Sequence, residues 1–169
     1  MKQRFDSVEE KVIQSLFGLQ KKVDSIGDTS TDWTRAVKNQ IGRLGTSLGY
    51  EVYASSCDFA KGGEWLFDLT WADIDRDKYL RGVPLALECE WIPSDVADDF
   101  CKLMVSRAKH RVMVFWASNR ASATKKVKEL IREVTNSQLS KKGDRYAFAC
   151  WIEDADKFDF RLYVVPWSA

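Results

Sequence analysis

The segments EWLFDLTW (residues 64–71) and VPLALECEW (residues 83–91) decide the fold, because both are apolar, strand-like runs that contain acidic side chains. Side chains alternate between the two faces of a strand, so Asp68 lies opposite the aromatic residues of the first run. The same alternation places Glu88 and Glu90 on one face of the second run. If the two strands are neighbours with these faces aligned, three carboxylates converge, and such a cluster requires protons, water or a bridging metal ion.

A structural interpretation of these acids stays open beside the metal. Asp68 would then pair with an arginine or cap a turn, and Glu88 with Glu90 would form the solvated face of an amphipathic strand. Against this, the apolar residues directly before Glu88 show no polar alternation, which is typical of a strand covered on both faces. We therefore pursue the metal hypothesis.

Hydrophobic periodicity predicts the remaining elements. Helices are predicted at 5–26, 33–48, 94–108 and 124–134, and strands at 50–55, 64–71, 83–91, 111–118, 145–153 and 160–167. The charged segment at 73–82 is interpreted as a loop. This order predicts an α/β fold in which a single mixed β-sheet is flanked by helices, and the strand-helix-strand step from residue 83 to 117 is its parallel, right-handed crossover.

Size and composition indicate one domain spanning 1–169. The chain has 169 residues, 45% hydrophobic and 30% charged, which suits one sizeable core. Its four cysteines form no CxxC pair, which is typical of buried thiols in a reducing compartment. No stretch has the apolar length of a signal peptide or membrane span, so we expect a cytoplasmic protein without a membrane partner.

Charge is distributed unevenly although the net charge is only +1. Residues 51–99 contain 12 acidic and 4 basic side chains, whereas residues 100–145 contain 12 basic and 3 acidic ones. An acidic site beside a basic surface is typical of a protein that binds a phosphate backbone. The candidate phosphate-binding residues are Arg107, Lys109, Arg111, Lys125, Lys126 and Lys128. The alternative is that the lysines of the last helix are simply its solvated face.

The tryptophans at 65, 71, 91, 116, 151 and 167 lie in predicted strands. Core packing is expected for them, and base stacking, which requires exposure, is the alternative.

Asp68 lies on the second strand of a predicted meander and Glu-x-Glu on the third, and a crossover helix and another strand follow. In this order of elements and motifs, the region 33–117 resembles the PD-(D/E)XK nuclease superfamily. The resemblance implies a restriction-endonuclease-like αβββαβ core, here with an extra N-terminal helix (1–30) and C-terminal helix and strands (118–169). It implies that Asp68 and Glu88 bind Mg²⁺ or Mn²⁺, and that Glu90 stands where the superfamily usually has lysine.

Two departures from the superfamily pattern concern residues near the motif. The helix at 33–48 has no carboxylate in its body, and Gln40 is the nearest polar substitute. The lysine missing from the motif leaves Lys102, on the following helix, as the replacement that the resemblance suggests. At about 100° per residue, however, Lys102 falls nearly opposite the apolar stripe and should point to solvent.

The sequence thus predicts a metal-dependent nuclease that hydrolyses phosphodiester bonds at Asp68, Glu88, Glu90 and Lys102. We expect a nucleic-acid partner, with DNA as the first expectation. The alternative is a catalytically inactive nuclease-fold module that binds nucleic acid or protein. The first helix either docks on the core or mediates a homodimer, since both bury the same face.

Overall fold

The computed structural model describes residues 3–57 and 60–166. Its helices are α1 (Ser7–Gln20), α2 (Ser30–Ser47), α3 (Val96–Val105) and α4 (Arg120–Asn136), and its strands are β1 (Glu51–Tyr53), β2 (Leu69–Ile74), β3 (Leu80–Glu90), β4 (His110–Ala117), β5 (Arg145–Ile152) and β6 (Lys157–Val164). Two short 3₁₀ turns lie at Val23–Ser25 and Glu153–Ala155. The result is the α/β fold with one mixed sheet and flanking helices that the element order predicts.

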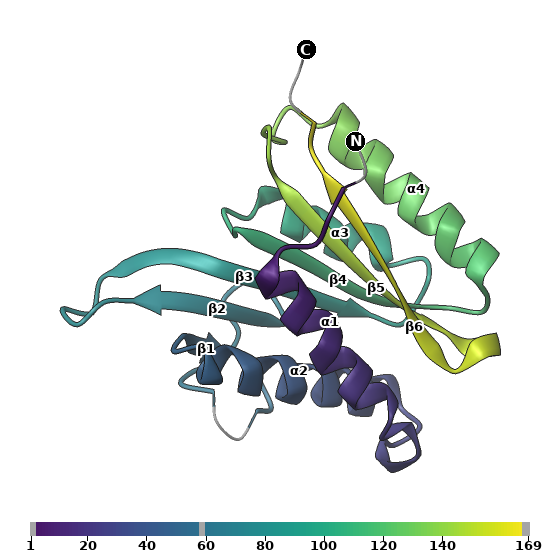
Figure 1. Ribbon diagram of the computed structural model, residues 1–169, viewed down its shortest axis with the longest axis horizontal. Coiled ribbons are helices and arrows are strands. Elements are labelled where there is room, and N and C mark those ends of the chain that lie inside the picture. Colours follow the sequence, from purple (N-terminus) through teal and green to yellow (C-terminus); the bar gives the residue numbers. More distant parts are fainter. Residues whose placement is uncertain (1–2, 58–59, 167–169) are drawn as a thin grey trace.

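The sheet contains six strands in the order β1-β2-β3-β4-β5-β6 (Figure 1). β1, β2 and β3 form an antiparallel meander, β3, β4 and β5 are parallel, and β6 returns antiparallel beside β5. The parallel step from β3 to β4 is made through α3, as a parallel connection requires a crossover. The carboxyl ends of β3, β4 and β5 therefore lie at the same end of the sheet.

Two apolar cores lie on the two faces of this sheet. Val112 and Val114 of β4 belong to the core under α1 and α2, whereas Met113 and Phe115 belong to the core under α3 and α4 (Figure 1). This alternation follows from the two-residue period of a strand. The apolar stripe of α1 is buried within the chain, so this helix docks on the core.

Helix α2 lies close to the sheet because one of its residues is glycine. Trp71 of β2 is fully buried, and its indole N–H donates to the carbonyl of Ile41 at 3.2 Å. A Cβ atom at Gly45 would come within 2.4 Å of the same indole nitrogen. Gly45 thus permits the contact that holds α2 against β2. This contact also positions the side chains that α2 directs toward the sheet.

The helix predicted at 5–26 is interrupted. Asp6 caps α1 through the amides of Val8 and Glu9, and the helix ends at Gln20 before the 3₁₀ turn. A 3₁₀ turn has a tighter radius than an α-helical one, which suits the reversal of the chain into α2.

The charged segment at 73–82 is not a loop. β2 and β3 extend through most of it, and the turn between them is closed by the Asp75 side chain, which accepts from the amides of Asp77 and Tyr79 at 3.0 and 2.9 Å. The hairpin projects beyond the rest of the sheet (Figure 1), and most of its charged side chains are exposed. The charged residues at 73–82 therefore belong to a β-hairpin, and the prediction of a loop there is wrong.

The predicted strand at 64–71 begins only at Leu69. Trp65 is 45% exposed and packs at a tilt against the ring of Tyr53, with centroids 4.3 Å apart, so the expectation that it belongs to the core is wrong. Trp71 and Trp151 are buried, as expected. Trp167 lies outside the described residues. Within residues 3–57 and 60–166, each helix is too short or too polar to cross a lipid bilayer.

Candidate metal site

Asp68 and Glu88 come together on the face of the sheet covered by α3. Leu69 pairs with Leu87 across the antiparallel β2–β3 ladder, so Asp68, one residue earlier, lies opposite Glu88. One Asp68 oxygen accepts from the backbone N–H of Cys89 at 2.8 Å. The alternation of the two segments thus predicted this pair correctly, although Asp68 lies just before the strand rather than inside it.

Glu88 is a buried carboxyl group, and one of its oxygens makes no hydrogen bond. Its residue is 2% exposed, and its Oε1 atom has no hydrogen-bond partner. Burial, and then the charge of Asp68, raise the pKa of Glu88 to about 8. Burial also raises the pKa of Asp68, against the Cys89 amide, which favours the charged form. A buried carboxylate pair of this kind gains stability from a cation that satisfies both groups.

Glu90, the third carboxylate expected to converge here, does not complete a cluster with Asp68 and Glu88: within the described residues, the three-residue group with ligand atoms within 4.8 Å of one another lies elsewhere, around Asp6. The Oε1 atom of Glu90 accepts from the backbone N–H of Ile92 at 2.7 Å. Burial raises the pKa of Glu90, and the neighbouring Asp99 of α3 raises it further. Asp99, which the sequence analysis did not single out, therefore extends the acidic row from β3 onto α3.

Lys102 reaches this acidic row even though 44% of its side chain is exposed. Its Nζ atom lies 2.6 Å from Asp99 and 3.8 Å from Glu88 Oε1. The exposure agrees with the expectation that Lys102 points to solvent, but the buried stripe of α3 (Val96, Phe100 and Leu103) is centred nearer Val96 than expected. Lys102 then flanks the stripe, and its long stem brings the ammonium back to the acids.

Lys38 of α2 approaches from the other side and was missed by the sequence analysis. It is 4% exposed, and its Nζ donates to Ser55 at 3.0 Å and to Glu64 at 2.8 Å. Burial leaves the pKa of Asp68 raised, and the positive charge of Lys38 opposes this rise. A lysine in a polar helical position gives no periodic signal for such burial. Gln40, the substitute suggested for the helical acid, instead donates to the Ser15 carbonyl of α1.

A groove of about 390 Å³ runs beside this site between α2, the end of β1 and the end of β3. Its lining includes Arg35, Lys38, Ser55, Cys89 and Glu90. The groove therefore gives solvent and solutes access to the edge of the acidic row.

Three of the predicted basic residues lie away from the acids. Arg107 and Lys109 are exposed at the amino-terminal end of β4, whereas Glu88 and Glu90 lie toward the carboxyl end of the parallel strand β3. Arg111 is only 5% exposed. It is committed internally, since its guanidinium donates to the carbonyls at 103 and 106, pairs with the carboxylate at 144 and lies 5.1 Å from the ring at 146. The prediction that Arg111 contacts nucleic acid is therefore wrong.

The lysines of α4 remain on the surface. Lys125 and Lys128 are exposed, and Lys126 pairs with Glu129 at 3.5 Å. Because α4 begins just after the carboxyl end of β4, these side chains lie nearer the acidic end of the sheet than Arg107 does.

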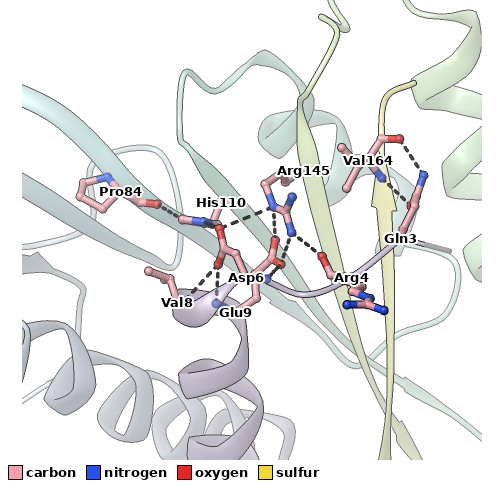
Figure 2. A network of polar contacts seen from close by, with 9 residues as sticks. All are labelled: Gln3, Arg4, Asp6, Val8, Glu9, Pro84, His110, Arg145 and Val164. Carbon is pink, nitrogen blue, oxygen red and sulfur yellow. Dashed lines mark hydrogen bonds and ion pairs between the residues drawn. The ribbon is translucent and has the colours of Figure 1, made fainter. Parts of the chain in front are cut away.

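A second acidic cluster ties α1 to the sheet (Figure 2). Asp6, Glu9 and His110 lie close together. Within the described residues, they form the one group of three or more His, Cys, Asp or Glu side chains whose possible metal-ligand atoms are within 4.8 Å of one another. Both Glu9 oxygens accept from Arg145, at 2.8 and 2.6 Å. His110 faces the Pro84 carbonyl at 2.9 Å and Asp6 at 2.7 Å. Burial opposes ionisation of Asp6, but the His110 contact and the helix amides leave its pKa lowered. The side-chain atoms that could bind a metal ion therefore already make hydrogen bonds or ion pairs within the protein, and we interpret this network as structural.

Comparison of the chain with protein-family models, with curated proteins and with solved structures found no match.

Proposed function

We propose that the protein is a metal-dependent nuclease whose Asp68 and Glu88 bind Mg²⁺ or Mn²⁺, as the resemblance of its motifs to the PD-(D/E)XK superfamily implies. The observation that supports this most directly is the buried Glu88 carboxyl group, which faces a second carboxylate and whose Oε1 atom makes no hydrogen bond, although the Lys102 ammonium lies 3.8 Å from it. Hard oxygen donors suit Mg²⁺, which takes one or two carboxylates and keeps several waters. When bound, such an ion polarises a phosphate and lowers the pKa of a coordinated water.

The other side chains have roles that follow from their positions. Lys102 lies within 3.8 Å of Glu88 and is half-exposed, so its ammonium can donate to a phosphate oxygen. Glu90 has a pKa raised by burial and by the neighbouring Asp99, which suits a group that accepts the proton of the attacking water. Arg35 and Lys38 line the groove and offer positive charge to the phosphate backbone.

The second candidate function, a binding module without catalysis, is favoured by one observation. Glu90 occupies the position of the motif lysine. One of its oxygens accepts a hydrogen bond from the backbone N–H of Ile92 at 2.7 Å, so this oxygen is not free to act beside Asp68 and Glu88.

The first prediction separates these two functions. Cleavage of plasmid and oligonucleotide should require Mg²⁺ or Mn²⁺, and Asp68→Asn and Glu88→Gln should each reduce it by at least roughly 10- to 100-fold, because each removes a ligand charge. Glu129→Gln, which changes an acid on α4, is the matched control.

Calorimetric titration with Mn²⁺ supplies the second measurement. Binding that is lost in Glu88→Gln, without cleavage by the wild type, would support the binding module. Equal cleavage in the wild type and both site variants would refute the proposed nuclease.

A further inference from the structure

Tryptophans line up across three neighbouring strands at the carboxyl end of the parallel part of the sheet. Trp116 of β4 pairs in register with Trp151 of β5. Trp91 follows Glu90, whose partner on β4 is Phe115, so Trp91 stands beside Trp116. In open α/β sheets, ligands bind at this end of the strands. Sequence periodicity predicted these residues as core, but Trp91 and Trp116 are only partly buried.

Trp33 of α2, which covers this face of the sheet, packs against the row of tryptophans. Its ring centroid lies 5.5 Å from that of Trp91 and 4.8 Å from that of Trp151. The indole N–H of Trp91 donates to Thr34 at 2.8 Å, which fixes the orientation of this ring. The four indoles thus come from four elements and are held by packing and by a hydrogen bond.

The tryptophans line an open hollow of about 330 Å³, which we call the tryptophan pocket. Its lining consists of Asp28, Ser30, Trp33, Trp91, Trp116, Trp151 and Glu153. Among the residues that the structure describes, no arginine or lysine lines it. Within residues 3–57 and 60–166, the exposed carboxylates of Asp28 and Glu153 make no ion pair and accept no side-chain hydrogen bond.

We propose that the tryptophan pocket binds an organic cation through its trimethylammonium group. The faces of aromatic rings attract cations, tryptophan most strongly, and a methylated ammonium matches an apolar wall because it has no N–H to satisfy. Asp28 and Glu153 supply the opposite charge at the rim. A nucleotide would also stack on indoles, but its phosphates would lie near two carboxylates and no basic side chain of the lining.

The tryptophan pocket is distinct from the proposed metal site. Trp91 and Glu90 are consecutive on an extended chain, so their side chains lie on opposite faces of the sheet. The tryptophans belong to the core under α1 and α2, whereas Glu88 lies under α3. Cation binding therefore does not depend on the proposed nuclease, and Glu88→Gln should leave it unchanged.

The test uses the whole chain and observes the indole N–H signals by ¹H–¹⁵N NMR. Choline and a peptide with trimethyl-lysine represent the free and the protein-borne sources of the same group. Either should shift the signals of Trp91 and Trp116 but not that of Trp65, which lies outside the pocket. The neutral choline isostere 3,3-dimethylbutan-1-ol should bind at least about tenfold more weakly, because it lacks the charge.

Two variants test the residues themselves. Trp116→Leu keeps an apolar side chain on β4 and should weaken choline binding at least about tenfold. The double variant Asp28→Asn/Glu153→Gln, which changes exposed residues only, should weaken choline binding and leave the affinity for the neutral isostere unchanged. Trp65→Leu is the control and should bind choline as the wild type does.

The proposal would be overturned by equal affinity for choline and its isostere, which would show a merely apolar hollow. It would also be overturned if guanosine monophosphate bound more tightly than choline, or if neither cation shifted the pocket signals.

Discussion

Glu88 links the stability of the protein to pH. Its pKa in the folded protein, about 8, exceeds the ordinary value of 4.5 because the group is buried beside Asp68. The folded state therefore retains a proton that the unfolded state releases. The contribution of the protonated Glu88 to the stability of the folded state is therefore complete below about pH 4.5. This contribution is lost as the pH rises through 8.

The resulting prediction concerns Glu88→Gln without divalent ions. The free energy of unfolding of the wild type, relative to this variant, should fall by up to about 1.4 kcal/mol per pH unit between pH 5 and 8. Urea unfolding at each pH measures the difference, and Glu129→Gln should show no such trend. A difference between wild type and Glu88→Gln that did not change with pH would contradict the buried acid.

At the scale of elements, the network around Glu9 holds α1 on the sheet. The Glu9 side chain is 1% exposed and its salt bridge to Arg145 is bidentate, so the pair joins the first turn of α1 to the start of β5 (Figure 2). Charge-assisted bidentate bonds of this kind set orientation as well as strength. The same turn contacts β4 through Asp6 and His110.

We predict that Arg145→Met lowers the free energy of unfolding by about 3–5 kcal/mol, because it leaves the Glu9 carboxylate buried without its opposite charge. Glu9→Leu/Arg145→Met should recover much of this loss, since both charges are then removed. Chemical denaturation measures both effects.

The control for this pair is Lys126→Met, which breaks a more exposed salt bridge to Glu129 and should cost at most about 1 kcal/mol. A loss of similar size in Arg145→Met would show that the α1 network contributes little.

At the scale of the whole molecule, the acids of the proposed metal site and the basic residues at 107–109 lie at opposite ends of the sheet. The acids of β3 and α3 lie toward the carboxyl ends of the parallel strands, and Arg107 and Lys109 lie at their amino-terminal ends. Positive charge close to the acids comes from Lys38 and Lys102. A phosphate backbone at the proposed metal site would therefore meet α2 and α4 before the basic surface at 107–109.

This arrangement predicts different salt dependences for two pairs of variants. Lys125→Gln/Lys128→Gln should reduce the slope of log affinity for DNA against log salt by about 0.9 for each lost contact. Arg107→Gln/Lys109→Gln should leave the slope unchanged. Fluorescence anisotropy over a range of salt concentrations measures both, and the reverse result would place the nucleic acid at the other end of the sheet.

The sequence by itself determined the α/β class, the order of the elements and the shared face of Asp68 and Glu88. These properties follow from periods of two and 3.6 residues, which depend only on local backbone geometry. Local patterns were less reliable where charge and exposure mattered, because the hairpin at 73–82 is charged yet regular, and Trp65 is aromatic yet exposed.

The tertiary structure alone decided which side chains meet. Lys38 is buried beside Glu64 because Gly45 lets α2 approach Trp71, and Lys102 reaches Glu88 because of how α3 is rotated on the sheet. The tryptophan pocket likewise depends on the register of β4 with β5. Helix rotation and strand register are set by packing between segments far apart in the chain, and no period within one segment contains that information.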